Sequence, residues 1–130
     1  MLAHPPLLLV EPDAERAAEL RGVLADAQFQ VAIGASGEAG LDLLGGDEAW
    51  ALLVVSWKLP DMNGVKFIRS AVREGSFEGG VVLYDCGALE SAEERLAALA
   101  EDYPFDYQIL EEPCDVTEIL EALDEVRAAD

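Results

Sequence analysis

The chain has 130 residues, 52% of them hydrophobic, a length that suits one domain with a core that needs neither disulfides nor metals. Eight Lys and Arg stand against 27 Asp and Glu, which gives a formal net charge of −19 at pH 7. This charge repels phosphate backbones and anionic membranes, so we expect neither direct nucleic-acid binding nor membrane binding.

The cysteine content and the absence of long apolar segments indicate a cellular location. Two cysteines, Cys86 and Cys114, are too few for a disulfide framework. The sequence has no signal-peptide pattern and no apolar run of membrane-spanning length. We therefore expect a reducing, cytoplasmic environment.

Five short apolar runs predict β-strands. They lie at residues 7–10, 29–33, 51–55, 81–84 and 107–110. The strongest of them are apolar at consecutive positions instead of alternate ones, which is typical of parallel strands that are covered on both faces.

Segments with helical periodicity lie between and after these runs. The first helix is predicted behind Asp13, a suitable N-cap, on small and apolar residues spaced three and four apart: Ala17, Leu20, Leu24 and Ala27. A second helix is predicted to open at Ser36 and to run through Leu44, and a third to follow Gly64.

Two capping boxes predict the starts of the last two helices. They are "SAEE" at 91–94 and its Asp-started analogue "DVTE" at 115–118. The order is then strand and helix five times over, with a loop at 75–80. Such alternation, with right-handed crossovers, predicts an α/β fold with a doubly wound parallel sheet.

Ligands of such a sheet bind outside the carboxyl ends of its strands, so the residues that end strands are the candidates for function. After the first, third, fourth and fifth strands these are Glu11, Pro12 and Asp13; Ser56, Trp57 and Lys58; Asp85 and Cys86; and Glu112 and Pro113.

Three segments resemble the receiver domain of two-component response regulators: "LLLVEPDAERAAEL", "LLVVSWKLPDMNGVKFI" and "LEEPCDVTEIL". Pro60, Gly64 and Pro113 stand where the family has its scaffold residues. The resemblance implies one CheY-like domain over residues 1–130, with a flavodoxin-like (βα)5 fold and strand order 2-1-3-4-5. It leaves open whether the chain is a fragment of a longer signalling protein.

The residues that carry the family's chemistry differ. In receivers an Asp that ends the third strand accepts a phosphoryl group, helped by an acidic pair, Mg²⁺, a Thr or Ser, and a Lys. Ser56 stands at the acceptor position, Pro12 replaces one acid of the pair, and Asp85 and Glu112 stand at the Thr and Lys positions.

These substitutions predict a degenerate phosphorylation pocket. A serine hydroxyl without an adjacent base is a weak nucleophile, and Mg²⁺ would lose oxygen ligands. We expect no catalytic residue, no bound metal and no cofactor in this pocket, which consists of Glu11, Pro12, Asp13, Ser56, Lys58, Asp85 and Glu112.

The pocket's carboxylates should repel one another. Two carboxylates about 5 Å apart repel by roughly 3 kcal/mol at an effective dielectric of about 20. Our hypothesis is that Lys58 folds over the pocket and pairs with Glu11 or Asp85. The alternative is that the charged side chains splay into water.

The resemblance and the altered pocket together imply a non-enzymatic, receiver-like domain of a two-component or phosphorelay system. It would act by protein contacts without phosphorylation, with a histidine kinase, an output domain or another receiver as partner, a homodimer included. We expect the contact surface on the fourth helix, fifth strand and fifth helix, including Leu96, Leu99, Tyr107 and Ile119.

Other interpretations remain open at this point. A histidine kinase could still phosphorylate a neighbouring carboxylate, such as Asp61 or Asp13. A small-ligand binder of flavodoxin-like topology would want Gly, Ser and Thr donors where "EPDAE" stands. Cys86 and Cys114 would follow neighbouring strands, which allows either a redox pair or two unrelated thiols.

Overall fold

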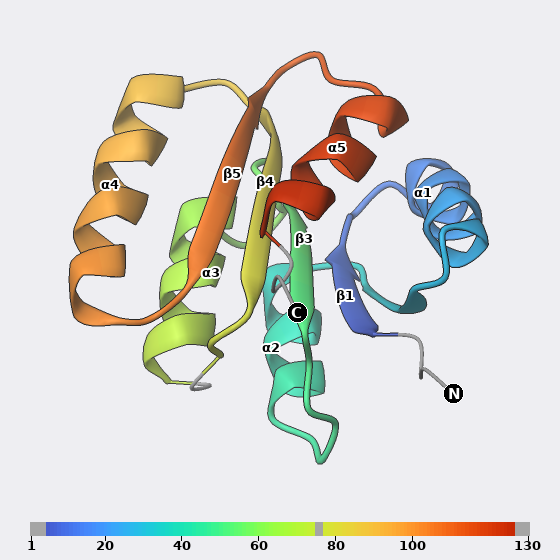
Figure 1. The fold of residues 1–130 in the computed structure, drawn as a ribbon, viewed down its shortest axis with the longest axis horizontal. Coiled ribbons are helices and arrows are strands. Elements are labelled where there is room, and N and C mark those ends of the chain that lie inside the picture. Colours follow the sequence, from blue (N-terminus) through green and yellow to red (C-terminus); the bar gives the residue numbers. More distant parts are fainter. Residues whose placement is uncertain (1–4, 75–76, 127–130) are drawn as a thin grey trace.

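The computed structural model describes residues 5–74 and 77–126 and contains five strands that alternate with five helices (Figure 1). The first two residues of the predicted loop at 75–80 lie outside the described residues. In chain order the elements are β1 (Pro6–Val10), α1 (Ala14–Asp26), β2 (Gln30–Gly34), α2 (Gly37–Leu44), β3 (Leu52–Ser56), α3 (Gly64–Arg73), β4 (Gly80–Cys86), α4 (Leu89–Asp102), β5 (Asp106–Glu111) and α5 (Val116–Val126).

The five strands form one parallel sheet in the order β2-β1-β3-β4-β5, which confirms the predicted fold class and strand order. Val10 pairs with Val55 across β1 and β3, and Ser56 pairs with Tyr84 across β3 and β4. Because the strands are parallel and in this register, the residues that follow β1, β3 and β4 emerge at one edge of the sheet.

Helices cover both faces of the sheet (Figure 1). On one face α1 and α5 pack on alternate strand residues such as Leu7, Leu9 and Val54. On the other face α2, α3 and α4 pack on the residues between them, such as Leu8 and Val55. This two-sided burial is the physical reason for the continuous apolar runs in the sequence.

Three predicted helix starts are confirmed by their caps. The Asp13 carboxylate accepts hydrogen bonds from the backbone N–H groups of Glu15 and Arg16, and Ser36 Oγ accepts one from Ala39. At α5 the predicted capping box is reciprocal: Asp115 and Glu118 each accept a hydrogen bond from the other's backbone N–H.

The predicted capping box at 91–94 is wrong. Helix α4 begins at Leu89, and its N-cap is Ala88, which makes no side-chain cap hydrogen bond. The backbone N–H of Ala92 already donates to the carbonyl of Ala88, so Ser91 lies inside the helix. The chain turns into the helix directly after Gly87, one turn before the residues that have the capping pattern.

Gly64 shows why the turn after β3 needs a glycine. A Cβ on this residue would lie 2.7 Å from the carbonyl oxygen of Ser56 and 2.5 Å from the Leu83 side chain. The start of α3 is therefore pressed against the end of β3. Within the described residues, no helix is both long enough and apolar enough to span a membrane.

Candidate functional site

The candidate site lies at the carboxyl edge of the sheet, where the residues after β1, β3, β4 and β5 meet. Glu11 follows β1, Ser56 ends β3, Asp85 lies near the end of β4, and Glu112 follows β5. Glu11 and Ser56 are buried, with 5% and 4% of their surface exposed. Buried polar groups need partners, so the hydrogen bonds of each residue decide what the site can do.

Both carboxylate oxygens of Glu11 accept hydrogen bonds from the protein. Tyr84 donates its hydroxyl to Oε1, and the backbone N–H of Asp13 donates to Oε2 at 2.9 Å. Burial, together with the Glu11 carboxylate, raises the pKa of Tyr84 well above its ordinary value, so the phenol stays a donor. This tyrosine contact was not predicted from the sequence.

Ser56 makes its hydrogen bonds with the turn that follows it. Its Oγ accepts from the backbone N–H of Lys58 at 3.3 Å and donates to the carbonyl of Lys58 at 3.5 Å. Neither partner is a base that could activate the hydroxyl. The serine hydroxyl is therefore hydrogen-bonded within the turn that follows β3.

The cation that neutralises Asp85 is Arg16, a residue of α1 that the sequence analysis did not single out. Arg16 Nη1 lies 3.2 Å from Asp85 Oδ2, and Nη2 donates to the carbonyl of Cys114 at 3.2 Å. The guanidinium also lies over the Tyr84 ring, 5.5 Å from its centroid. Burial alone would lower the pKa of Arg16, but Asp85 raises it above the ordinary value.

The backbone at Asp85 helps to aim its side chain. Its φ of 55° lies in the left-handed region, which Asp tolerates better than most residues. The pairing of β4 with β5 is irregular there, with a register shift between Leu83 and Cys86. Leu83 pairs with Ile109 and Cys86 pairs with Glu111, so β4 has one residue more than β5 over this stretch.

The hypothesis that Lys58 pairs with Glu11 or Asp85 is wrong. Lys58 Nζ instead lies 2.5 Å from Glu112 Oε1, and this hydrogen bond raises the pKa of Lys58. Both side chains are exposed, at 59% and 42%. Asp85 is paired with Arg16, so Asp85 and Glu112 each have a cation of their own.

The carboxylates of Asp13 and Asp61 accept hydrogen bonds from the first backbone N–H groups of two helices. Asp13 Oδ1 accepts two backbone hydrogen bonds at the start of α1. Asp61 accepts from the N–H groups of Gly37 and Glu38, both at 2.9 Å, and these bonds lower its pKa. Pro12, between Glu11 and Asp13, is exposed and offers neither a carboxylate nor a backbone N–H.

The donor set does not fit the Mg²⁺ that the receiver resemblance implies. Within residues 5–74 and 77–126, no group of three or more His, Cys, Asp or Glu is arranged to hold a metal ion. Glu11 is bound by two protein donors and Asp85 is paired with a cation. A hard cation would have to displace Arg16 to bind Asp85, and the Tyr84 hydroxyl or the Asp13 N–H to bind Glu11.

The two cysteines are buried and are free thiols. Cys114 Sγ lies 3.5 Å from Asp85 Oδ1, within hydrogen-bond distance for sulfur. Burial raises the pKa of both thiols, which lowers the fraction of reactive thiolate. The two residues therefore act as core groups here, and the suggestion of a redox pair gains no support.

Two of the four residues predicted for the partner surface are in the core. Leu96 and Ile119 have no exposed surface, because they lie on the helix stripes that pack on the sheet. Leu99 and Tyr107 are half-buried. The Tyr107 hydroxyl donates to Glu93 at 2.6 Å. In the sheet, Tyr107 pairs with Val81 and Ile109 pairs with Leu83.

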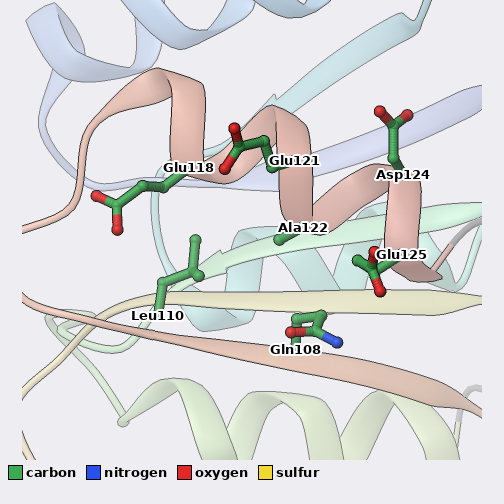
Figure 2. A pocket seen from close by; sticks show the side chains of 7 residues that line it. All are labelled: Gln108, Leu110, Glu118, Glu121, Ala122, Asp124 and Glu125. Carbon is green, nitrogen blue, oxygen red and sulfur yellow. The ribbon is translucent and has the colours of Figure 1, made fainter.

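An acidic groove of about 500 Å³ lies between β5 and α5 (Figure 2). Figure 2 shows the carboxylates of α5 above Gln108 and Leu110 of β5. Four acids line the groove: Glu118, Glu121, Asp124 and Glu125. This part of the expected partner surface is therefore more acidic than apolar.

Comparison with solved structures identifies the fold. A sensor protein from Polaromonas sp. JS666 superposes with a TM-score of 0.77 at 25% identity, covering 94% of each chain. The chemotaxis response regulator CheY4 of Vibrio cholerae gives a TM-score of 0.75 at 14% identity, covering 95% of this chain and 98% of that one. An adenylate cyclase from Rhodopirellula baltica gives 0.74 at 21% identity, covering 94% and 86%.

Response regulator receiver domains from other organisms also match. No protein-family model matches the sequence, and no curated protein matches it. The chain has the CheY-like fold of response regulator receiver domains, as the resemblance in the sequence implies.

Proposed function

We propose that the protein is a receiver-like signalling domain that works without phosphorylation and without catalysis, through contacts with other proteins. Residues 1–130 would form one such domain. One observation carries this proposal: the two acids at the strand ends, Glu11 and Asp85, are already bound by donors of the protein itself.

The charges around the pocket also oppose a phosphoryl group. In the receiver family a lysine after the fifth strand would attract it, whereas Glu112 stands at this position. The nearby Lys58 is paired with Glu112, and Arg16 is paired with Asp85. An incoming phosphate would have to break an ion pair to gain a cation, and it would then face the released carboxylate.

Phosphorylation of a neighbouring acid is the weaker alternative. Asp13 is the N-cap of α1, and Asp61 accepts hydrogen bonds from the first two backbone N–H groups of α2. An acyl phosphate on either residue would remove these hydrogen bonds from the start of the helix. We therefore do not favour Asp13 or Asp61 as the acceptor.

The partner would bind on the face formed by α4, β5 and α5. Tyr107 is half-buried there, and the groove between β5 and α5 is lined by four acids. Complementary charge favours a partner surface with Lys and Arg side chains. A histidine kinase, an output domain or another receiver could present such a surface.

The test is incubation of the intact protein with acetyl phosphate and Mg²⁺, followed by intact-mass measurement. A parallel ¹⁵N-resolved spectrum is recorded with beryllofluoride and Mg²⁺, and a receiver that has the acceptor Asp serves as positive control. We expect no mass gain and no shifted resonances. A mass gain of one phosphoryl group, or beryllofluoride shifts around Glu11 and Ser56, would overturn the proposal.

A further inference from the structure

Helix α3 differs in charge from the rest of the molecule. Its sequence, GVKFIRSAVR, has three cations and no acid, although the chain as a whole has 27 acids and eight Lys and Arg. The cations are Lys66, Arg69 and Arg73, which lie three and four residues apart and therefore on one face of the helix. All three are exposed.

A groove of about 590 Å³ lies between this helix and α4. Lys66 and Arg69 line it from α3, and Arg95 lines it from α4. Val65, Ala98 and Leu99 supply apolar wall, and Asn63 and Asp102 complete the lining. The groove thus combines three positive charges and one negative charge with apolar surface.

Among the residues that the structure describes, no ion pair involves the three cations that line the groove. In the part of the chain that the structure describes, the ion pairs are Arg16 with Asp85 and Lys58 with Glu112. Neither pair includes Lys66, Arg69 or Arg95, even though acids are more than three times as frequent as cations in the sequence. Like charges three or four residues apart destabilise a helix slightly. The cluster of cations on α3 is therefore not explained by a gain in stability.

We propose that the groove between α3 and α4 binds an amphipathic acidic segment of a partner protein. Carboxylates of the segment would pair with Lys66, Arg69 and Arg95, while its apolar side chains would contact Val65 and Leu99. A helix with acids and leucines three and four residues apart suits a groove between two helices. The charge complementarity is local, since the chain as a whole has a net charge of −19.

The net charge distinguishes this occupant from other anions. A nucleic acid presents a long row of negative charge, which the net charge of −19 repels. A short segment with two or three carboxylates meets far less repulsion, because charges beyond about 8 Å are screened at physiological ionic strength. A free phosphate would leave the apolar wall of the groove without a contact.

This surface is separate from the acidic groove described above. Helix α3 packs on one face of the sheet and α5 on the opposite face, as Figure 1 shows. The protein would then present two grooves of opposite charge that share no lining residue. The inference does not depend on whether the strand-end pocket accepts phosphate.

The experiment is a titration of the ¹⁵N-labelled protein with a synthetic helical peptide that has Glu and Leu at spacings of three and four. The control peptide has Gln in place of each Glu. We expect resonances of α3 and α4 near Lys66, Arg69 and Arg95 to shift with the acidic peptide. The Gln peptide should bind at least about tenfold more weakly, because its charge contacts are lost.

Variants make the test specific. Arg69→Glu and Arg95→Glu should each weaken peptide binding at least about tenfold, whereas Arg21→Glu should change it by less than about twofold. Arg21 is an exposed cation of α1, so this control has the same change of net charge outside the groove. Circular dichroism of each variant checks that it is folded.

Four outcomes would overturn the proposal. The peptide could leave α3 and α4 unshifted at millimolar concentration, or Arg21→Glu could weaken binding as much as Arg69→Glu. Inorganic phosphate or duplex DNA alone could reproduce the same shifts with equal affinity. Finally, the shifts could arise when the protein alone is concentrated, in which case a second copy of this chain is the occupant.

Discussion

The guanidinium of Arg16 joins the start of α1 to the end of β4, since it pairs with Asp85 at 3.2 Å. It also donates to the carbonyl of Cys114, which follows β5. One side chain thus connects three segments at the edge where receivers hold a metal ion. A tethered cation is always present at this edge, whereas a metal ion is present only when it is bound.

Replacement of Arg16 by Ala should destabilise the protein. The change leaves Asp85 without its cation and the Cys114 carbonyl without a donor, and it removes the stacking on Tyr84. Because the pair is partly exposed, we expect a loss of about 2 kcal/mol in the free energy of unfolding, less than for a fully buried pair. Urea denaturation monitored by circular dichroism measures it.

Arg21→Ala is the matched control, because Arg21 is an exposed cation of the same helix. It should change the free energy of unfolding by less than about 0.5 kcal/mol. Equal effects of the two substitutions would mean that the contacts of Arg16 contribute nothing to stability.

The fold could be predicted from the sequence because a sheet that is buried on both faces needs strands that are apolar at consecutive positions. Runs such as Leu7 to Val10 and Leu52 to Val55 are apolar throughout and predict covered parallel strands, and the structure has them. The cap at Asp13 and the capping box at 115–118 were also readable, because each depends on contacts within four residues.

The hydrogen-bond and ion-pair partners of the site's side chains could not be predicted from the sequence, because these contacts join residues far apart in the chain. Ser56, Asp85 and Glu112 follow from the strand ends, but Arg16 reaches Asp85 across 69 positions, and Tyr84 reaches Glu11 across 73. The sequence did contain one signal for Arg16: it is a cation in the first turn of the helix that follows β1. The helices' apolar periodicity could also have placed Leu96 and Ile119 in the core.

The stability of the protein should fall with pH in the alkaline range. The pKa of Tyr84 is raised well above its ordinary value of 10.0, and that of Tyr107 is raised to about 12. Above pH 10 the unfolded tyrosines ionise while the folded ones stay protonated, so unfolding releases protons. The stabilisation is therefore complete below pH 10 and is lost as pH rises.

Substitution separates the two tyrosines. In Tyr84→Phe the fall above pH 10 should be shallower by up to about 1.4 kcal/mol per pH unit, the contribution of one proton. In Tyr107→Phe the slope should change only between pH 10 and about 12, where that hydroxyl titrates. Urea unfolding at a series of pH values gives both slopes, and a slope unaltered in Tyr84→Phe would contradict the assignment.

A better N-cap on helix α4 should stabilise the protein. Its N-cap, Ala88, provides no side-chain acceptor for the first N–H groups. Ala88→Ser should raise the free energy of unfolding by about 0.5 to 1 kcal/mol, because a serine hydroxyl can accept one of these N–H groups. Ser91→Ala, inside the helix, should not destabilise the protein; a loss there would restore the predicted capping box at 91–94.

Placing a carboxylate at residue 56 should make the protein both less stable and sensitive to Mg²⁺. Ser56 is buried, so Ser56→Asp adds a charge without a partner near Glu11 and Asp85, and we expect a loss of about 1 to 3 kcal/mol in the free energy of unfolding. Ser56→Ala should cost less than about 1 kcal/mol, because the hydrogen bonds of Oγ with Lys58 are long, at 3.3 and 3.5 Å.

Mg²⁺ should raise the melting temperature of the Ser56→Asp variant alone, since only this variant gains a ligand and binding to the folded state stabilises it. An equal rise in the native protein would mean that Glu11 and Asp85 already form a metal site in spite of Arg16 and Tyr84.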